Sequence, residues 1–484
     1  MWAKRFGSTG FDHGNAIAVD GSGNVFTSGY FNATVDFDPG AGTFTLATAG
    51  NADVFISKLD AAGNFVFAKR IGGAGNDIGN AIRLDAAGNV LTTGSFDGTV
   101  DFDPGAATVN LVSSGASTDI FISKLDASGN YVWAKRMGGS FTDRGYSSEA
   151  DAGGNVYTTG YFQGNADFDP GAGTFTLSSS SNTEDIFVSK LDASGNFLWA
   201  RAMGGAGNDQ AISLALDASG NVHTTGWYQG VADFDPGPTT FTLNSPPGIN
   251  DEIFVSKLNA SGNFVWAKHM GGSTMDEGFS IDVDGSGNVY TTGGFTGTAD
   301  FDPGPGTFTL TAPGIADDIF ISKLDATGNF VCAGKLGGTG DDWGLAIAVD
   351  ATGNIYSSGF FNGTGDFDPN AGIFNLTSAG GADAFISKLS PSCSGVGMNE
   401  IVASDFELKI FPNPGTGDFN LILHPANGFP NSITVEDLMG RNVLNFSNIY
   451  SYENKLDLVN TSGGIFIVKV LYTDKIFTKR IIKN

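Results

Sequence analysis

A five-residue motif recurs six times in this chain at a nearly constant spacing. It has the sequence Asp-Phe-Asp-Pro-Gly in five copies and Asp-Phe-Asp-Pro-Asn in the last. The copies begin at Asp36, Asp101, Asp167, Asp233, Asp300 and Asp366. The repeat is therefore about 66 residues long, and a period of this length indicates one structural unit built several times. We expect a repeat array rather than a chain with one irregular core.

Each repeat has the features of antiparallel β-sheet. Short segments rich in Thr, Val, Ile and aromatic residues alternate with turns of the form Asp-x-x-Gly-Asn, as at Asp126 to Asn130. In such turns the Asp side chain accepts hydrogen bonds from the backbone that follows it, and Gly tolerates a positive φ. One copy is predicted to hold strands within 80–96, at 119–125 and at 131–136. Four strands repeated six times predict an all-β fold, a six-bladed β-propeller over residues 1–390.

The beginning of the chain matches the fourth strand of a repeat. Residues 1–7 align in register with residues 132–138, so that Trp2 corresponds to Trp133. We predict that this segment completes the last blade and closes the ring. The alternative is a chain with a truncated start, taken from a longer array, since no secretion signal precedes the repeats.

The repeats resemble a known family. Residues 342–359, which begin Asp-Trp-Gly-Leu-Ala-Ile and end Ser-Ser-Gly, together with 383–389, Asp-Ala-Phe-Ile-Ser-Lys-Leu, are similar to the bacterial β-propeller repeat called SBBP. The resemblance covers about residues 1–390. It implies a propeller that is usually extracellular and that has no common catalytic activity. The Asp-Phe-Asp-Pro-Gly excursion makes each repeat longer than the short form of that family, which leaves the number of blades open.

The repeated motif supplies the candidate metal ligands. The excursion is predicted to be a hairpin on the same face as the linkers between blades, which hold Asp12, Asp77, Asp143, Asp209, Asp276 and Asp342. Its two aspartates point the same way along a strand, about 6–7 Å apart. Acidic, oxygen-rich loops suit Ca²⁺. The predicted ligands are Asp36, Asp38, Asp101, Asp103, Asp167, Asp169, Asp233, Asp235, Asp300, Asp302, Asp366 and Asp368. In the alternative interpretation, the motif Phe anchors the hairpin between blades while the aspartates cap turns or face water.

Other recurring and unique residues were sought as signs of function. A lysine recurs in the third strand of every repeat and is predicted to pair with a neighbouring carboxylate; its copies are Lys58, Lys124, Lys190, Lys257, Lys323 and Lys388. Residues that break the repeat are Arg144, Glu149, His223, Trp227, His269, Cys332 and Trp343. The sequence holds no nucleophile elbow, zinc-protease helix or phosphate loop, so catalysis is disfavoured. A pair of carboxylates acting on a polysaccharide stays open, as does a disulfide between Cys332 and Cys393.

The net charge of the chain limits the classes of partner that it can bind. The 51 acidic residues outnumber the 25 basic ones, which gives a net charge of −26. Such a field repels nucleic acid and anionic membranes and attracts cations or basic partners. The chain contains no apolar run long enough for a transmembrane helix.

The composition changes after the repeats. Residues 391–404 are predicted to be a linker, and residues 405–484 a small Ig-like β-sandwich of short alternating strands. Segments 410–414, 438–441, 464–469 and 479–483 resemble the type A C-terminal sorting domain of the type IX secretion system. That resemblance implies a Bacteroidota protein that the type IX machinery carries to the extracellular space or the outer-membrane surface.

Together these features predict a non-catalytic propeller, secreted or at the cell surface, for ligand or glycan recognition or adhesion. Two alternatives are a polysaccharide-acting hydrolase or lyase and a structural surface-layer component. One cleft that gathers the repeat-breaking polar residues would favour a single site. Six equivalent clefts would favour scaffolding or multivalent binding.

Overall fold

The protein divides into two compact units, Met1–Gly397 and Met398–Asn484. The structure is a computed structural model. It describes residues 2–115, 117–246, 251–369, 372–390, 409–411, 415–423, 429–437, 441–447, 449–459, 461–471 and 476–483. Over these ranges the fold is all-β apart from one short 3₁₀ turn, η1 (Ser180–Asn182). The predicted linker at 391–404 lies outside the described residues.

The first unit consists of six antiparallel sheets. The first sheet holds β1 (His13–Val19), β2 (Val25–Asp36), β3 (Thr45–Leu59), β4 (Phe65–Gly73), β7 (Thr99–Asp101) and β8 (Asn110–Val112). The second holds β5 (Ile78–Leu84), β6 (Val90–Asp97), β9 (Thr118–Leu125), β10 (Tyr131–Gly139), β13 (Asn165–Asp167) and β14 (Thr176–Ser178). The third holds β11 (Arg144–Ala150), β12 (Val156–Gln163), β15 (Glu184–Leu191), β16 (Phe197–Gly205), β19 (Val231–Asp233) and β20 (Thr242–Asn244).

The remaining sheets follow the same plan, except the last. The fourth holds β17 (Gln210–Leu216), β18 (Val222–Tyr228), β21 (Glu252–Leu258), β22 (Phe264–Gly272), β25 (Thr298–Asp300) and β26 (Thr309–Thr311). The fifth holds β23 (Asp276–Val283), β24 (Val289–Thr296), β27 (Asp317–Leu324), β28 (Phe330–Gly338), β31 (Thr364–Asp366) and β32 (Asn375–Thr377). The sixth holds only β29 (Trp343–Val349), β30 (Ile355–Phe361) and β33 (Asp383–Leu389).

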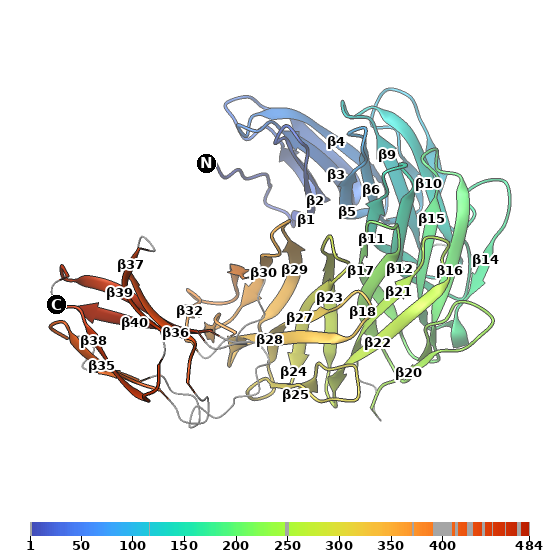
Figure 1. The fold of residues 1–484 in the computed structure, drawn as a ribbon. Helices are drawn as coiled ribbons and strands as arrows, with labels where there is room; N and C mark the ends of the chain where they lie inside the picture. The colour runs from blue at the N-terminus through green and yellow to red at the C-terminus, as the bar shows by residue number, and fades with distance from the viewer. Residues whose placement is uncertain are drawn as a thin grey trace. The chain divides into compact units, whose positions relative to one another are not determined.

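The sheets are arranged as the blades of a propeller. The first strand of each is its inner strand, and β1, β5, β11, β17, β23 and β29 pack in this order, each against the next (Figure 1). Apolar clusters fill the space between successive sheets, from Phe26 and Phe121 at the first interface to Tyr290 and Phe385 at the fifth. One sheet cannot bury both faces, and stacking blades does so. The predicted all-β, propeller-like fold is confirmed.

From the second repeat on, the excursion of a repeat extends the sheet of the preceding repeat, whereas that of the first repeat continues β2 and β3 of its own sheet. The hairpin β7–β8 belongs by sequence to the second repeat, but Asp101 and Val100 pair with Gly72 and Gly73 of β4 in the first sheet. The hairpins β13–β14, β19–β20, β25–β26 and β31–β32 do the same one sheet further on. The five complete sheets therefore have six strands rather than the predicted four, and each hairpin joins two neighbouring blades.

The motif phenylalanine anchors each hairpin. Phe102 is fully buried and lies 5.4 Å from Phe96 and 5.2 Å from Phe121, measured between ring centroids. The same trio recurs in the other repeats, and the copies Phe37, Phe168, Phe234, Phe301 and Phe367 are at most 6% exposed. Aromatic side chains contribute large buried areas, so each hairpin is fixed by packing as well as by its backbone pairing.

The predicted closing strand is not formed in this structure. Residues 2–6 carry no strand, and β33 has one hydrogen-bonded neighbour, β30, among the residues described. The segment instead makes the contacts that a fourth strand makes with the following blade. Trp2 Nε1 donates to the Ala61 carbonyl at 3.0 Å, just as Trp133 Nε1 donates to that of Ala193 at 3.2 Å. Phe6 likewise packs on Phe37 of the first repeat, with 5.6 Å between ring centroids.

The second unit is a sandwich of two sheets. One contains β34 (Lys409–Phe411), β35 (Asp418–Ile422) and β38 (Glu453–Asp457), and the other contains β36 (Ser432–Asp437), β37 (Asn442–Ser447), β39 (Gly464–Leu471) and β40 (Ile476–Lys483). A single apolar cluster joins them, with Phe419 and Leu456 from one sheet and Ile433 and Val468 from the other. This packing is that of the predicted small β-sandwich.

Candidate functional site

A cavity of about 730 Å³ lies where the six inner strands converge. Every inner strand contributes to its lining, for example through Asn15, Arg83, Tyr146, Ser213, Phe279 and Ala348. Pockets for small ligands are usually about 300–1,000 Å³ and combine apolar walls with a few polar groups. This central cavity therefore has the size and the mixed lining of a ligand site.

Polar side chains tie neighbouring inner strands together around the cavity. Asn15 Nδ2 donates to the Gly79 carbonyl, and Asn80 Nδ2 donates to the Gly145 carbonyl, both at 2.9 Å. Further round, serine hydroxyls accept from the next inner strand: Ser147 from Leu214 N, Ser213 from Ile281 N and Ser280 from Ile347 N. These bonds satisfy backbone groups and hold the wall of the cavity rigid.

One register position of the inner strands breaks the repeat. It holds Ala18, Arg83, Glu149, Ala215, Asp282 and Ala348, which pair in register with Phe26, Leu91, Tyr157, His223, Tyr290 and Tyr356 on the adjacent strands. We call these six residues the axial belt. Three of its members are charged and three are alanines, so the six blades are not equivalent at the axis.

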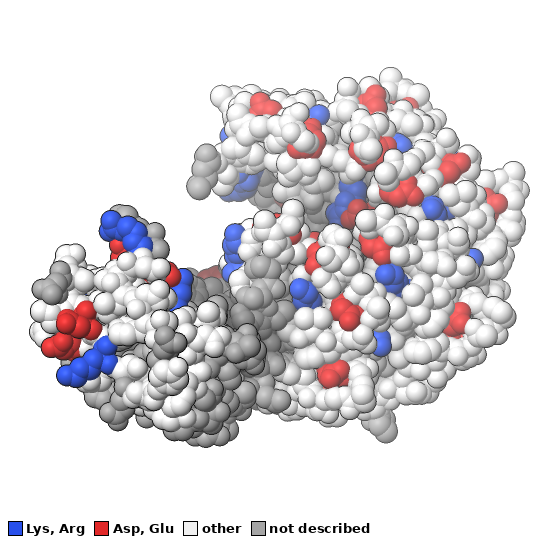
Figure 2. Space-filling view, viewed as in Figure 1, with Lys and Arg blue, Asp and Glu red and all other residues white. Residues whose placement is uncertain are grey.

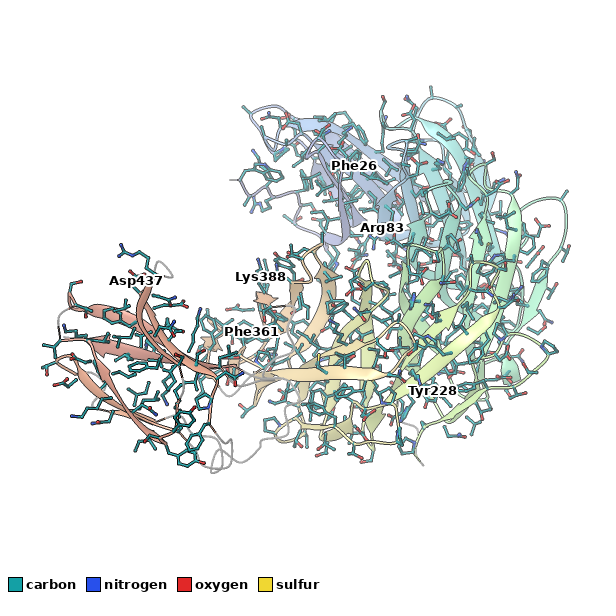
Figure 3. The ribbon with its side chains drawn as sticks, in the orientation of Figure 1. Phe26, Arg83, Tyr228, Phe361, Lys388 and Asp437 are labelled. Carbon is teal, nitrogen blue, oxygen red and sulfur yellow. The ribbon has the colours of Figure 1, made fainter. Side chains whose placement is uncertain are left out.

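The charged belt residues interact across blades. Arg83 Nε forms an ion pair with Glu149 Oε1, and Arg83 Nη1 donates to the Ile82 carbonyl at 2.9 Å. Burial raises the pKa of Glu149, and Arg83 opposes the shift. Asp282 accepts from Val349 N at 2.7 Å and from Val283 N at 2.8 Å, and burial likewise raises the pKa of its carboxyl. Figure 3 marks Arg83 on β5, at the inner side of the blades.

The sequence identified only part of this site. Glu149 was singled out as a repeat-breaking residue and lies in the axial belt. Arg83 and Asp282 were missed, because each looks unremarkable until the inner strands are compared at one register position. Trp343 begins the inner strand β29 and lies 4.9 Å from Phe279 of the cavity lining, between ring centroids.

The other repeat-breaking residues lie in several places. His223 is fully buried on β18, 3.4 Å from Asp217, and burial lowers its pKa to about 4, with Lys257 as the next cause. Arg144 begins β11, Trp227 lies on β18 and His269 on the outer strand β22. Cys332 is disulfide-bonded, and the chain's other cysteine, Cys393, lies outside the described residues.

The first aspartate of each motif caps its own hairpin. Asp101 Oδ1 accepts from Asp103 N at 3.1 Å and from Val109 N at 2.8 Å. Asp36, Asp167, Asp233, Asp300 and Asp366 accept the same two backbone bonds at 2.8–3.0 Å. These carboxylates satisfy backbone donors at the turn, which is the structural role considered as the alternative to metal binding.

The second aspartate of each motif caps the turn that follows. Asp38, Asp103, Asp169, Asp235 and Asp302 accept from the backbone N of the residue two positions on at 2.7–2.8 Å. Asp368 of the sixth repeat also has an interaction partner. Within the described ranges no group of three or more His, Cys, Asp or Glu side chains is arranged to hold a metal ion. Calcium at these loops stays a prediction.

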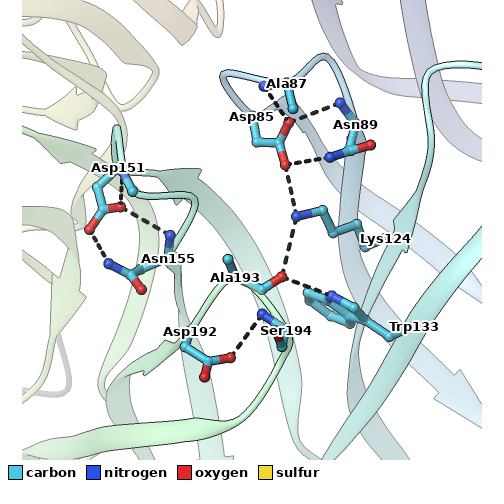
Figure 4. Close-up of polar contacts among 11 residues, drawn as sticks. Asp85, Ala87, Asn89, Lys124, Trp133, Asp151, Asn155, Asp192, Ala193 and Ser194 are labelled. Carbon is cyan, nitrogen blue, oxygen red and sulfur yellow. Dashed lines mark hydrogen bonds and ion pairs between the residues drawn. The ribbon is translucent and has the colours of Figure 1, made fainter.

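The repeated lysine and the turn aspartate form a joint between blades (Figure 4). Asp85 Oδ1 accepts from Ala87 N and Asn89 N, both at 2.9 Å, as predicted for the Asp-x-x-Gly-Asn turn. Lys124 Nζ lies 2.8 Å from Asp85 Oδ2 and donates to the Ala193 carbonyl of the next blade. The predicted pairing is confirmed for Lys124, Lys190 and Lys257, while Lys58, Lys323 and Lys388 lie over aromatic rings.

The surface in view offers no comparable signal. Acidic and basic side chains are interspersed over the face of the molecule that Figure 2 shows. All six inner strands contribute to the central cavity, and Arg83 and Ala348 of the axial belt are in its lining, so this cavity is our candidate functional site.

Comparisons with known proteins give a family match for the C-terminal residues and two longer relatives that align with more than half of the chain. Residues 409–484 match the family described as secretion system C-terminal sorting domain. The chain is 26% identical over 324 residues to a WD repeat-containing protein of Acanthamoeba polyphaga mimivirus, over 56% of this chain and 23% of the relative. It is 27% identical over 327 residues to the regulatory protein FlaEY of Caulobacter vibrioides, over 62% of this chain and 32% of the relative. The chain thus spans less than a third of either relative.

Two solved structures from Bacteroides thetaiotaomicron are also similar. One is the extracellular domain of a hybrid two-component system, 13% identical with a TM-score of 0.19, covering 97% of this chain and 73% of that one. The other is a structural genomics protein of unknown function, 12% identical with a TM-score of 0.20, covering 78% of this chain and 100% of that one. Similarity at this level carries no argument about function.

The C-terminal match bears on where the protein acts. No helix in the described part of the chain combines the length and apolar character needed to cross a membrane. The sandwich of β34 to β40 covers the matched residues. Residues 409–484 are thus similar to the sorting domains of type IX secretion, which implies that the protein is exported to the cell surface or beyond it.

Proposed function

We propose that this protein is a non-catalytic recognition module of the cell surface or its surroundings, and that its central cavity binds a polar ligand such as a surface glycan. The observation that carries the proposal is the axial belt. Six repeats of one unit converge on one cavity, the belt on their inner strands is where the repeats differ in charge, and Arg83 of the belt lines the cavity. The sorting tail supports a place outside the cell for such binding.

The lining of the cavity suits a carbohydrate better than an apolar ligand. Tyr146 and Phe279 supply aromatic surface, and the guanidinium of Arg83 supplies hydrogen-bond donors besides the one that it directs at Glu149. A site that combines flat aromatic rings with polar groups can stack on sugar rings and bind their hydroxyls. Backbone carbonyls and serine hydroxyls of the wall are already engaged between strands, so recognition falls to the side chains of the belt and its neighbours.

A second candidate is a hydrolase that acts on the same glycan. Glu149 and Asp282 influence each other electrostatically, and burial raises the pKa of each carboxyl. Two carboxyl groups that flank a glycosidic bond are the machinery of most glycosidases. Against this role, Glu149 is held by Arg83, and Asp282 is held by two backbone N–H groups.

The test is a glycan array probed with the full chain, followed by titration of any ligand found. Arg83→Met should weaken binding at least about tenfold, the equivalent of about 1.4 kcal/mol. Lys69→Met is the matched control, because Lys69 lies on the fourth strand β4 over the Phe67 ring and away from the cavity lining. Binding that is unaffected by Arg83→Met, or an array without binding, would contradict the proposal.

The same samples separate the two candidates. Cleavage of the bound glycan that disappears in Asp282→Asn would replace the recognition function by the hydrolase. Intact glycan after prolonged incubation, together with retained affinity, supports recognition alone.

A further inference from the structure

Two buried acidic side chains lie near each other in each of the five complete sheets, and in the second to fifth sheets both face one glycine. One acid lies at or near the start of the third strand of the blade, and the other begins or precedes the next inner strand. The pairs are Asp53 with Asp77, Asp119 with Asp143, Asp185 with Asp209, Glu252 with Asp276, and Asp318 with Asp342, and all ten residues are at most 5% exposed. A Cβ on Gly138 would lie 2.8 Å from Asp143 Oδ2 and 2.9 Å from Asp119 Cγ. Only glycine therefore leaves room for both carboxyl groups.

The second acid of each pair is satisfied by backbone donors. Asp276 accepts from Gly272 N at 2.6 Å and from Thr296 N at 3.1 Å. Asp77, Asp143, Asp209 and Asp342 accept equivalent pairs of bonds at 2.6–3.2 Å. Each of these acids joins the end of one sheet to the second strand of the next, so its geometry is fixed.

A cation stabilises the first acid in three sheets but not in the fourth. Arg70 lies 3.2 Å from Asp53, Arg136 lies 2.8 Å from Asp119, and Lys335 lies 2.6 Å from Asp318. The equivalent position in the fourth sheet is His269, which pairs in register with Phe254 as Arg136 does with Phe121. In the third sheet it is Ala202, in register with Phe187.

Glu252 is therefore an unusual carboxyl group. It is fully buried, and neither of its oxygens has a hydrogen-bond partner in the structure. The nearby Gly272 N–H donates to Asp276 instead. His269 Nε2 lies 4.0 Å from Glu252 Oε2, beyond hydrogen-bond distance. An unpaired buried carboxylate is costly, whereas a protonated carboxyl group is much less so.

The groups that face Glu252 increase this cost. Asp276 on β23 and Asp251, the residue before Glu252 in sequence, both repel a charge on Glu252. Burial raises the pKa of Glu277 on β23, with Asp251 as the next cause. On the other side, Tyr228 OH of β18 lies 2.8 Å from His269 Nδ1. The negative charge of Asp300 raises the pKa of His269 and so opposes the effect of burial. Burial lowers the pKa of His269, so this ring is neutral and does not replace the missing guanidinium.

We propose that Glu252 is a proton-binding site, and that the proton it holds at neutral pH takes the place of the cation present in the first, second and fifth sheets. The site lies on β21, outside the central cavity, and is independent of the proposed ligand. Burial raises the pKa of Glu252 to about 9, with Asp276 as the next cause, and burial raises that of Asp276 to about 7. Burial and a neighbouring negative charge both favour the protonated form of a carboxyl group.

The proton makes the fourth sheet sensitive to alkali. The pKa of Glu252 is raised on folding, from 4.5 to about 9, so the folded protein binds more protons than the unfolded chain between these values. The stabilisation is fully present below the unfolded pKa and is lost as the pH rises through the folded one. Burial raises the pKa of Asp119 and of Asp143 in the second sheet only to about 7. Between about pH 7 and about pH 9, the fourth sheet should therefore lose stability that the second sheet keeps.

The experiment compares full-length variants by thermal unfolding and by hydrogen exchange of the β21 and β22 amides over this pH range. Glu252→Gln keeps the shape of the protonated side chain and cannot ionise. His269→Arg restores the guanidinium of the second sheet. Relative to either variant, the wild-type protein should show a further fall in Tm of at least about 3 °C between the two pH values, and faster exchange confined to these strands.

Arg136→His provides the matched control. It gives the second sheet the residue found in the fourth, and it should create a new alkaline sensitivity in β9 and β10. Equal pH profiles for the wild type and both fourth-sheet variants would overturn the proposal. So would recovery of the wild-type Tm at about pH 9 by added Na⁺ or Ca²⁺ that Glu252→Gln does not show, because the site would then take a metal ion instead of a proton.

Discussion

The second and sixth sheets are built from nearly the same sequence but differ in what covers them. Ile122 on β9 is fully buried, whereas Ile386, at the same place on β33, is 83% exposed. β9 has strands on both sides, and β33 has one neighbour among the residues described. The comparison teaches that a blade does not bury its own apolar side chains. Its neighbours do so, and stability in such an array is a sum of interfaces.

The largest difference is expected for the hairpin aromatic residues. Phe102→Ala removes a ring enclosed by Phe96 and Phe121 and should cost about 3–5 kcal/mol of unfolding free energy. Phe374→Ala, at the hairpin position of the sixth repeat that corresponds to Val109, removes a side chain that is 63% exposed and should change stability by less than about 0.5 kcal/mol. Urea unfolding of both full-length variants measures the difference. Similar losses in the two would show that the sixth repeat is covered in solution.

The next largest difference is expected between the third-strand lysines of the second and sixth sheets. Lys124→Met leaves Asp85 without its cation in a buried setting and should cost about 3 kcal/mol. Lys388→Met removes a cation that lies over the Tyr356 ring at an exposed site, so its effect on stability should be clearly smaller. The loss for Lys124→Met should persist at high salt, because a buried pair is screened less than an exposed one. A loss that disappears in salt would mean that this joint opens to water.

The smallest difference is expected for the capping aspartates. Asp101→Ala and Asp366→Ala each remove an acceptor of two backbone bonds, so each should cost about 1–2 kcal/mol, with no contrast between the sheets. Melting the same proteins with calcium and with a chelator tests the calcium hypothesis. A calcium-dependent rise in Tm that Asp101→Ala diminishes would support it, and identical melts with both additions would remove it.

Local patterns predicted the strands, the turns and the lysine pairs because these depend on residues close in sequence. Asp85 and Asn89 determine their own turn wherever the blade lies. The pairing of Asp101 with Gly72 was not predictable in this way. A three-residue strand can pair with any exposed sheet edge that the packing of the blades places beside it. The sequence of the hairpin alone does not specify that this edge is β4.

The candidate site was predictable only in part, for the same reason. Glu149 stands out in a simple comparison of repeats, but its significance depends on Arg83 and Asp282, which come from other blades. Conversely, the motif aspartates are the most conspicuous acids of the sequence, and in the structure they bind the backbone of their own hairpins. The residues repeated in every blade are those that stabilise its fold, whereas the inner-strand residues that differ between blades are the candidates for ligand binding.

The borrowed hairpins have a mechanical consequence for a protein displayed outside a cell. Repeats two to six each contribute two strands to the preceding sheet, so a pull on one of them loads the backbone bonds of two sheets. Detaching a single unit must break the ladder between its hairpin and the preceding fourth strand, in addition to its own sheet. We therefore expect the array to unfold under tension in steps that each involve more than one repeat.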